Sequence, residues 1–231
     1  MPTIFEQLED AHRVILDRLS CYEAHDEGHN FSWPNYVFRS STFRRAHLDI
    51  VDARDTKKLY MLHLTVMPNL DDPSPIFGFD IIAGPNKVTG AFHDFSPADP
   101  THPMLGWFRD RVSGLEWSRT RELPEWARNI FSRSMVAAGN IRDSQELATV
   151  IKLVTENLDY YLKEVGHGDG GDYTERHNWY CQNQKKNPHT PRVMEALGLD
   201  RAEVDRFIQT CLFPEVEPAT CVGDAGQSCR E

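Results

Sequence analysis

The chain has 231 residues, 40% of them hydrophobic, which is enough for one sizeable core and predicts a single domain. Its net charge of −10 is spread along the chain, and the lack of a basic stripe argues against a general nucleic-acid binder. No apolar run approaches the length of a membrane span, and the N-terminus is too charged for a secretory signal, so we expect a cytoplasmic protein without a membrane partner.

The cysteines do not suggest a framework of cross-links or a metal centre. Their number, five, is odd, and they form neither a CxxC nor a CxxCH pattern. We therefore expect no disulfide framework and no zinc or iron–sulfur site built from them. Two of them, Cys221 and Cys229, lie in residues 214–231, which are predicted to be a disordered tail after a domain of residues 1–213.

The predicted elements run from helix to strands to helices. Residues 3–20 predict an amphipathic helix, because Thr3 and Glu6 form a capping-box pattern and apolar residues recur on one face. Residues 35–95 alternate as strands between the turn sequences DARDTKK, NLDDPSP and GPNK. After Pro97, helices are predicted over residues 102–113, 124–133, 144–165, 173–186, 190–197 and 201–212. This order predicts an α+β fold in which an antiparallel sheet lies between helical layers.

The turns also predict which strand residues face each other, because facing residues of an antiparallel pair are equidistant from the turn centre. A centre within DARDTKK places His63 opposite Asp49 or His47, and both pairings keep these residues on one face. The middle of NLDDPSP places Asp80 opposite His63, and GPNK places Ala91 opposite Asp80. The sequence therefore predicts a polar row across the strands.

The alternation gives this sheet one apolar and one polar face. The apolar face consists of Leu48, Ile50, Leu62, Leu64, Phe79 and Ile81. Imidazole and carboxylate groups are unfavourable in a core unless they are paired, and close pairs shift each other's pKa. The polar row is therefore a candidate proton-transfer site. The competing interpretation is that its members are ordinary core or surface residues with satisfied hydrogen bonds.

A metal site is a further alternative for the same residues. His47 and Asp49 followed by another histidine resemble the two-histidine, one-carboxylate iron triad. However, His63 follows too soon for the usual barrel arrangement. The sequence has no Gly-rich phosphate loop and no nucleophile elbow. An enzyme with these residues would supply protons and shape, and would take its electrons from elsewhere.

Several stretches of the chain resemble one enzyme family. They are FRRAHLDI, LHLTVMP, PIFGFDIIAGPNKV, HDFSP, RELPEW and WYCQNQKKNPHTPRVMEALG. From about residue 35 to 213 the chain resembles the ferredoxin-dependent bilin reductases, in the branch of the phycocyanobilin:ferredoxin oxidoreductases and their relatives from phages and non-photosynthetic bacteria. The resemblance implies a three-layer α/β/α sandwich with a central antiparallel sheet. It also implies biliverdin IXα as the substrate, bound between the sheet and the C-terminal helices.

The resemblance implies a role for each member of the polar row. Asp80 matches an aspartate that contacts the pigment and passes on the first proton, and His63 matches the histidine hydrogen-bonded beside it. His47 matches a histidine that holds the D-ring end of the pigment through water. Asp49 stands where the phycocyanobilin-forming branch has a glutamate that is linked to reduction of the D-ring vinyl group. Since aspartate is one methylene shorter, we expect its carboxylate to fall short of that group.

Substrate contacts are expected at four further positions by resemblance and at Ala91 from its place in the row. Thr89 matches a serine that contacts a propionate, and Asn187, His189 and Thr190 match a polar segment near the pigment. Three of these also have an ordinary interpretation: Thr89 as a strand residue, Thr190 as a cap residue and His189 as a solvated loop residue. Tyr180, Trp179 and Phe92 are candidates for the pocket wall, and equally for the core.

One binding residue of the family is missing. The arginine that usually clamps a propionate aligns with Gly139, and Arg133 or Arg142 is a candidate replacement. The family binds no flavin and no metal, so we expect no bound cofactor. Ferredoxin is typically acidic and needs a basic patch on this acidic chain, for which the candidates are Lys57, Lys58, Arg44, Arg45, Lys185, Lys186 and Arg192.

The resulting prediction is a monomeric radical reductase that reduces biliverdin IXα by two electrons at each of two sites. Phycoerythrobilin is favoured over phycocyanobilin as the product because of Asp49. The alternative is a bilin-binding carrier or chaperone without turnover, and a third possibility is a purely structural domain.

Overall fold

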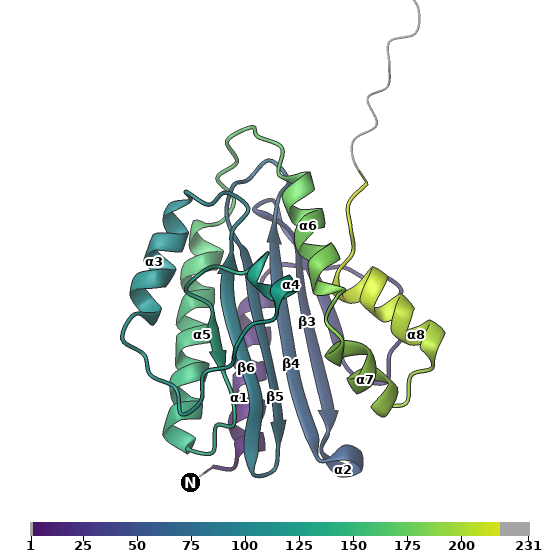
Figure 1. The fold of residues 1–231 in the computed structure, drawn as a ribbon. Coiled ribbons are helices and arrows are strands. Elements are labelled where there is room, and N and C mark those ends of the chain that lie inside the picture. Colours follow the sequence, from purple (N-terminus) through teal and green to yellow (C-terminus); the bar gives the residue numbers. More distant parts are fainter. Residues whose placement is uncertain (1, 218–231) are drawn as a thin grey trace, which may run out of the picture.

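The computed structural model describes residues 2–217, which form one seven-stranded sheet with helices on both faces (Figure 1). The strands follow one another in chain order and every neighbouring pair is antiparallel. Their bounds are β1 Glu23–Ala24, β2 Asn35–Arg39, β3 Phe43–Ala53, β4 Leu59–Pro68, β5 Ile76–Gly84, β6 Lys87–Ser96 and β7 Val136–Ala138. The predicted α+β, three-layer architecture is confirmed.

The helices lie close to their predicted positions. They are α1 Ile4–Leu19, α2 Arg54–Lys57, α3 Pro103–Val112, α4 Glu125–Arg128, α5 Ser144–Glu164, α6 Thr174–Gln184, α7 His189–Ala196 and α8 Arg201–Arg206, followed by the π-helical segment η1 Phe207–Leu212. The helix predicted over 124–133 is only the single turn α4. The α2 turn forms within DARDTKK and ends at Lys58, whose φ is 55°. Within residues 2–217 no helix is both long enough and apolar enough to cross a bilayer.

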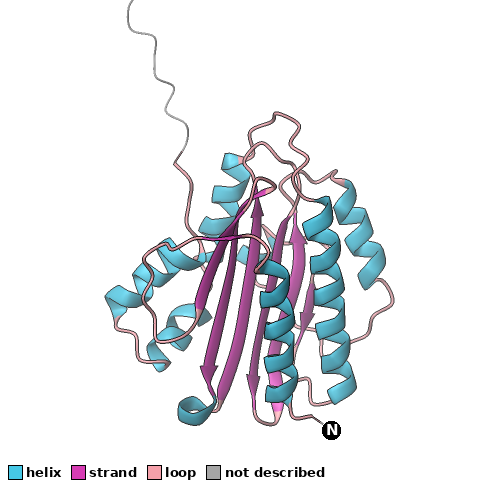
Figure 2. Ribbon diagram, turned by 180° about the vertical axis from the view of Figure 1, so that it is seen from behind, coloured by secondary structure: helices cyan, strands magenta, loops and turns pink. Residues whose placement is uncertain are grey.

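Three helices cover the apolar face of the sheet. Figure 2 shows α1 and α5 lying along the back of the sheet, and α3 packs beside them on β6. The predicted capping box of Thr3 and Glu6 fixes the start of α1, and Asp143 caps α5. The strand residues predicted for this face are all buried here, namely Leu48, Ile50, Leu62, Leu64, Phe79 and Ile81. This layer holds the larger of the two hydrophobic clusters.

Shorter helices cover the opposite face. Tyr180 of α6, Met194 of α7 and Phe207 of η1 pack with residues of β3, β4 and β5 in a second cluster. Figure 1 shows α6, α7 and α8 in front of the β3 side of the sheet. Because strand residues alternate between faces, the polar residues of the predicted row share the face toward this second layer. We call it the site face.

Candidate active site

A continuous row of facing residues crosses the site face from β2 to β6. Asn35 faces Asp49, Asp49 faces His63, and His63 faces Asp80. Asp80 in turn faces Phe92 on β6. The predicted pairs of His63 with Asp49 and with Asp80 are confirmed, and His47 faces Thr65 instead. The two hairpins thus bring groups that are far apart in sequence onto one line across the sheet.

The prediction that Ala91 faces Asp80 is wrong. Ile82 faces Gly90 whereas Ala83 faces Val88, so Thr89 is an extra residue that has no partner on β5. Such a bulge shifts the register by one, and a shift by one moves a side chain to the other face. Ala91 therefore faces Ile81, is fully buried in the core beneath α1 and α5, and cannot contact a substrate on the site face.

Asp80 has the properties of a proton donor. Its carboxyl group makes no hydrogen bond within residues 2–217, and part of the residue is exposed, so a ligand or water can reach it. Desolvation of the carboxyl group by the surrounding protein, with a smaller effect of the Asp49 charge, raises the pKa of Asp80 to about 7. A substantial fraction of the Asp80 carboxyl groups is therefore protonated at neutral pH, and only the protonated form can donate a proton.

His63 has the complementary properties. Burial, together with the positive charge of Arg45, lowers the pKa of His63 to about 4, so its imidazole is neutral at pH 7. Its Nε2 lies 3.0 Å from the hydroxyl of Thr65. The hydrogen bond to Asp80 that the resemblance implies is not formed within the described residues. Nδ1 of His63 forms no hydrogen bond within residues 2–217, and the residue itself faces Asp80 on the neighbouring strand.

Asp49 is held by two donors on the side away from Asp80. Its Oδ1 accepts hydrogen bonds from Trp33 Nε1 at 2.7 Å and from the side-chain amide of Asn35 at 2.9 Å. These contacts favour the charged form, but burial outweighs them and raises the pKa of Asp49 to about 7. The short side chain is therefore anchored toward β2.

His47 is fully buried next to Asp49. The amide nitrogen of Asn35 donates to both Asp49 and His47 Nε2, the second bond at 2.9 Å. Because Nε2 accepts this bond, the proton of the neutral ring is on Nδ1. Burial, followed by the positive charge of Arg45, lowers the pKa of His47 well below its usual value. The His47 and His63 rings lie 5.9 Å apart.

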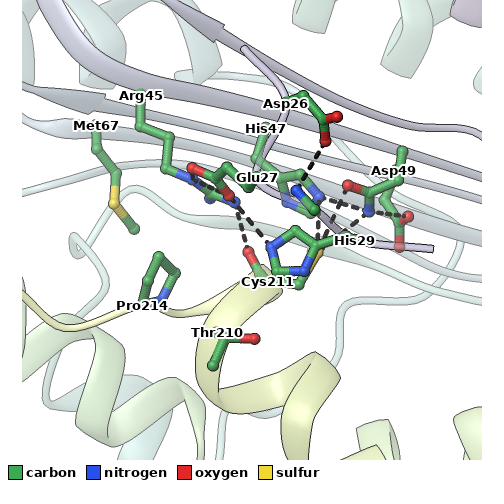
Figure 3. A network of polar contacts seen from close by, with 12 residues as sticks. Asp26, Glu27, His29, Arg45, His47, Asp49, Met67, Thr210, Cys211 and Pro214 are labelled. Carbon is green, nitrogen blue, oxygen red and sulfur yellow. Dashed lines mark hydrogen bonds and ion pairs between the residues drawn. The ribbon is translucent and has the colours of Figure 1, made fainter. Parts of the chain in front are cut away.

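A buried ion pair holds the segments that enclose this end of the site. Arg45, only 3% exposed, binds Glu27 of the loop before β2 and donates to the backbone carbonyl of Cys211 at 2.8 Å. Figure 3 shows Arg45, His47 and Asp49 pointing from β3 toward Cys211 of η1. The sulfur of Cys211 lies 3.5 Å from His47 Nε2. π-helical segments are rare in proteins and are frequently found at functional sites.

The basic residues predicted for ferredoxin docking are therefore not all at the surface. Arg45 is buried in the ion pair, and Arg44 points to Met67 and His177. Lys185 is largely covered and pairs with Glu215. The prediction that Arg45 is exposed was wrong because side chains alternate along a strand. Arg45 lies two residues from His47 and therefore points to the same, covered site face. The candidates that remain exposed are Lys57, Lys58, Lys186 and Arg192.

The C-terminal segment covers His63. Phe213 is buried and places its ring edge-to-face on His63, with the centroids 5.8 Å apart. The next residues are attached to α6, where Asn178 forms two hydrogen bonds with the backbone of Val216, each 2.8 Å long. Residues 214–217, which were predicted to begin the tail, thus include contacts with the domain. The remainder of that tail, with Cys221 and Cys229, lies outside the described residues.

The expected propionate-binding residues are separated from the row. The hydroxyl of Thr89, at the bulge, donates to the carbonyl of Ile82 at 3.0 Å and the residue is exposed. Asn187 accepts a hydrogen bond from the backbone of His189 at 3.0 Å, at the start of α7, and His189 is exposed. No hydrogen bond or ion pair joins Asn187, His189 or Thr190 to the row within residues 2–217. Their role in binding stays a prediction.

Two hollows lie near the residues of the row. One of about 310 Å³ is lined by residues 24–27, His29 and residues 35–38, and one of about 90 Å³ is lined by residues that include Tyr180, Trp179 and Ile76. Neither is lined by Asp80 or His63. The hydroxyl of Tyr180 lies next to Gly78, two residues from Asp80, and accepts a hydrogen bond from Gln184 at 2.8 Å. In the part of the chain that the structure describes, no group of three His, Cys, Asp or Glu side chains is arranged to hold a metal ion.

The sequence prediction missed several residues of the site. Asn35 could have been found, because a hairpin centred at Thr42 places it opposite Asp49. Trp33, Cys211 and Phe213 carry no such local signal, because loop and η1 geometry place them. Phe92, proposed as a wall residue, does lie on the site face.

Known proteins with this arrangement identify the family. A sequence profile of the family described as ferredoxin-dependent bilin reductase matches residues 4–214. The chain belongs to the ferredoxin-dependent bilin reductases. This enzyme is 32% identical over 198 residues to phycocyanobilin:ferredoxin oxidoreductase from Synechococcus sp. (strain CC9605), over 81% of this chain and 78% of that protein. It is 31% identical to the protein of that name from Prochlorococcus marinus (strain MIT 9313), over 83% of this chain and 74% of that protein.

Solved structures show the same architecture. The structure of PcyX is 32% identical in sequence, with a TM-score of 0.64 over 93% of this chain and 99% of that chain. Phytochromobilin synthase from tomato, solved in complex with biliverdin, is 12% identical, with a TM-score of 0.67 over 89% of this chain and 82% of that chain. At that identity the second likeness concerns the fold alone.

Proposed function

We propose that this enzyme reduces biliverdin IXα to a phycobilin with four electrons from reduced ferredoxin. Two double bonds are reduced, and each takes up two electrons and two protons. Ferredoxin delivers its electrons singly, so the reaction passes through bilin radicals that the protein protonates. Membership of the family and two relatives named phycocyanobilin:ferredoxin oxidoreductase support this assignment.

The observation that carries the proposal is the pairing of Asp80 with His63. The carboxyl group has its pKa raised to about 7, and the imidazole facing it has its pKa lowered to about 4. One group can therefore give a proton at neutral pH while its neighbour stays neutral. Both keep atoms without a protein partner, so a bilin nitrogen or oxygen placed between the sheet and α6 can bond to them.

Phycoerythrobilin is our proposed product, in preference to phycocyanobilin. Asp49 has a short side chain, and its Oδ1 is occupied by Trp33 and Asn35. A carboxyl group held in this way is poorly placed to protonate a vinyl group farther out over the sheet. Reduction would then begin at the 15,16 bridge and continue at the A-ring.

Anaerobic turnover with reduced ferredoxin and biliverdin, followed by chromatography, tests this proposal. We expect a 15,16-dihydro intermediate that absorbs at shorter wavelength than biliverdin, and then phycoerythrobilin. A vinyl-reduced intermediate appearing first would refute the assigned order. A spectral shift on binding without any product would instead indicate a bilin carrier.

A further inference from the structure

Arg121 extends the row of the site face beyond β7. The segment around it pairs with β7, because Thr120 bridges Ala138 and the backbone N–H of Arg121 donates to the carbonyl of Ala137 at 2.8 Å. Ala138 packs in the core beneath α1 and α5. Since side chains alternate, Thr120, which is exposed, is on the same face of the sheet as Ala138, and Arg121 lies on the site face.

This position places Arg121 on the same line as the proton donor. Asp80 faces Phe92, Phe92 faces Ala137, and Arg121 lies beside Ala137. The carbon of the guanidinium group lies 5.8 Å from the centroid of the Phe92 ring. A cation at this distance from an aromatic ring is attracted to it, which holds the side chain over the sheet.

Two glycines provide the space that this side chain occupies. A Cβ atom on Gly139 would lie 3.1 Å from Cγ, Cδ and Nε of Arg121. A Cβ atom on Gly90 would lie 3.2 Å from a guanidinium nitrogen and 2.7 Å from the Phe92 ring. Larger residues at either position would displace the arginine. Gly139 is the position at which the family usually has its propionate-binding arginine. In this chain the side chain of Arg121 lies against that position.

The guanidinium group has no anionic partner in the protein. Arg121 is exposed, and its side chain makes no hydrogen bond and no ion pair within residues 2–217, although the whole chain carries a net charge of −10. A guanidinium group presents a planar set of donors that fits a carboxylate with two parallel hydrogen bonds. An open-chain bilin lying across Asp80 and Phe92 carries two propionate carboxylates on its edge.

We propose that Arg121 binds a propionate carboxylate of the bilin substrate. This inference rests on the function proposed above. Of the two replacements considered from the sequence, Arg142 directly precedes Asp143, the cap of α5, and so belongs to the opposite layer. The other candidate, Arg133, is exposed in the turn before β7. The backbone N–H of the preceding residue, Ser132, donates a hydrogen bond to Asp94.

Binding of biliverdin and of its dimethyl ester, compared by spectral titration, tests this contact. Wild type should bind the free acid about ten- to a hundredfold more tightly than the ester, the range for a hydrogen bond to a charged group. Arg121→Gln should weaken binding of the acid by the same factor and change binding of the ester less than about twofold. Arg142→Gln and Arg133→Gln are matched controls that should keep the preference for the acid.

Each other outcome overturns the inference. Equal weakening of acid and ester by Arg121→Gln would show a purely structural role, and loss of the preference in either control variant would assign the contact elsewhere. If wild type turned biliverdin over but bound acid and ester equally, only the role of Arg121 would fail. If wild type bound neither compound, the proposed function itself would fail.

Discussion

Asp80 on β5 and His63 on β4 form a facing pair whose pKa values are shifted in opposite directions. Burial disfavours the charged form of both groups. It therefore raises the pKa of Asp80 to about 7 and lowers the pKa of His63 to about 4. The pair therefore carries one exchangeable proton at neutral pH rather than an ion pair.

Asp80→Asn should retain binding of biliverdin and lose turnover. The amide keeps the size of the side chain but cannot donate the carboxyl proton. We expect the rate of the first reduction to fall by at least about 100-fold, the lower range for a general acid. Single-turnover absorbance under anaerobic conditions measures this rate, and Asp55→Asn on the exposed α2 turn is the control. Asp80→Asn with a near-normal rate would remove Asp80 from the mechanism.

The rate should decrease as the pH rises through about 7. Asp80 can donate only when it is protonated, and its raised pKa places the loss of the proton there. His63, with a pKa of about 4, does not change charge between pH 6 and 8. The Asp49 charge contributes to the raised pKa of Asp80, so Asp49→Asn should move the profile to lower pH. A profile that moves upward, or that is flat to pH 9, contradicts this assignment.

Asp49→Glu should shift the products toward phycocyanobilin. The longer side chain brings the carboxylate one methylene closer to the vinyl group while Trp33 and Asn35 remain as donors. Chromatography of the products after complete turnover measures the ratio. Asp49→Asn, which keeps the length but loses the proton, is the control. If the ratio of the two products were unchanged in Asp49→Glu, the length of this side chain would not determine which product forms.

Glu27→Gln should destabilise the protein strongly. It removes the charge that compensates buried Arg45, and an uncompensated buried charge lowers the free energy of unfolding by about 3 kcal/mol. Glu156→Gln, which breaks the surface pair with Arg111, should lower it by less than about 1 kcal/mol. Urea unfolding measures both. Equal effects of the two variants would show that the Arg45 pair is not a buried anchor.

Turnover with ferredoxin should decrease with ionic strength, because an acidic partner is attracted by local basic residues. Lys186→Glu and Arg192→Glu, both at exposed positions on the side of α6 and α7, should raise the KM for ferredoxin. Lys163→Glu, at the end of α5 on the opposite layer, is the control. A KM that is independent of salt and of these substitutions would exclude this surface.

The sequence predicted the central row because hairpin register is a local property. Counting from the centre of the turn between β4 and β5 gives Asp80 as the residue that faces His63. The turn between β3 and β4 leaves Asp49 and His47 as alternatives, and the structure selects Asp49. The same counting failed for Ala91 because one extra residue, Thr89, enters the next hairpin. A bulge of this kind leaves no mark in the alternation until the strands pair.

The sequence by itself determined the layers, the two faces of the sheet and the pairing of His63 with Asp80, because period-two alternation and short hairpins act between near neighbours. Tertiary structure decided what surrounds that pair. The ion pair of Arg45 with Glu27, the ring of Phe213 on His63 and the position of Arg121 over Gly139 join segments whose spacing in the chain contains no information about their contact. Only packing of the loops and C-terminal helices against the sheet brings these side chains together.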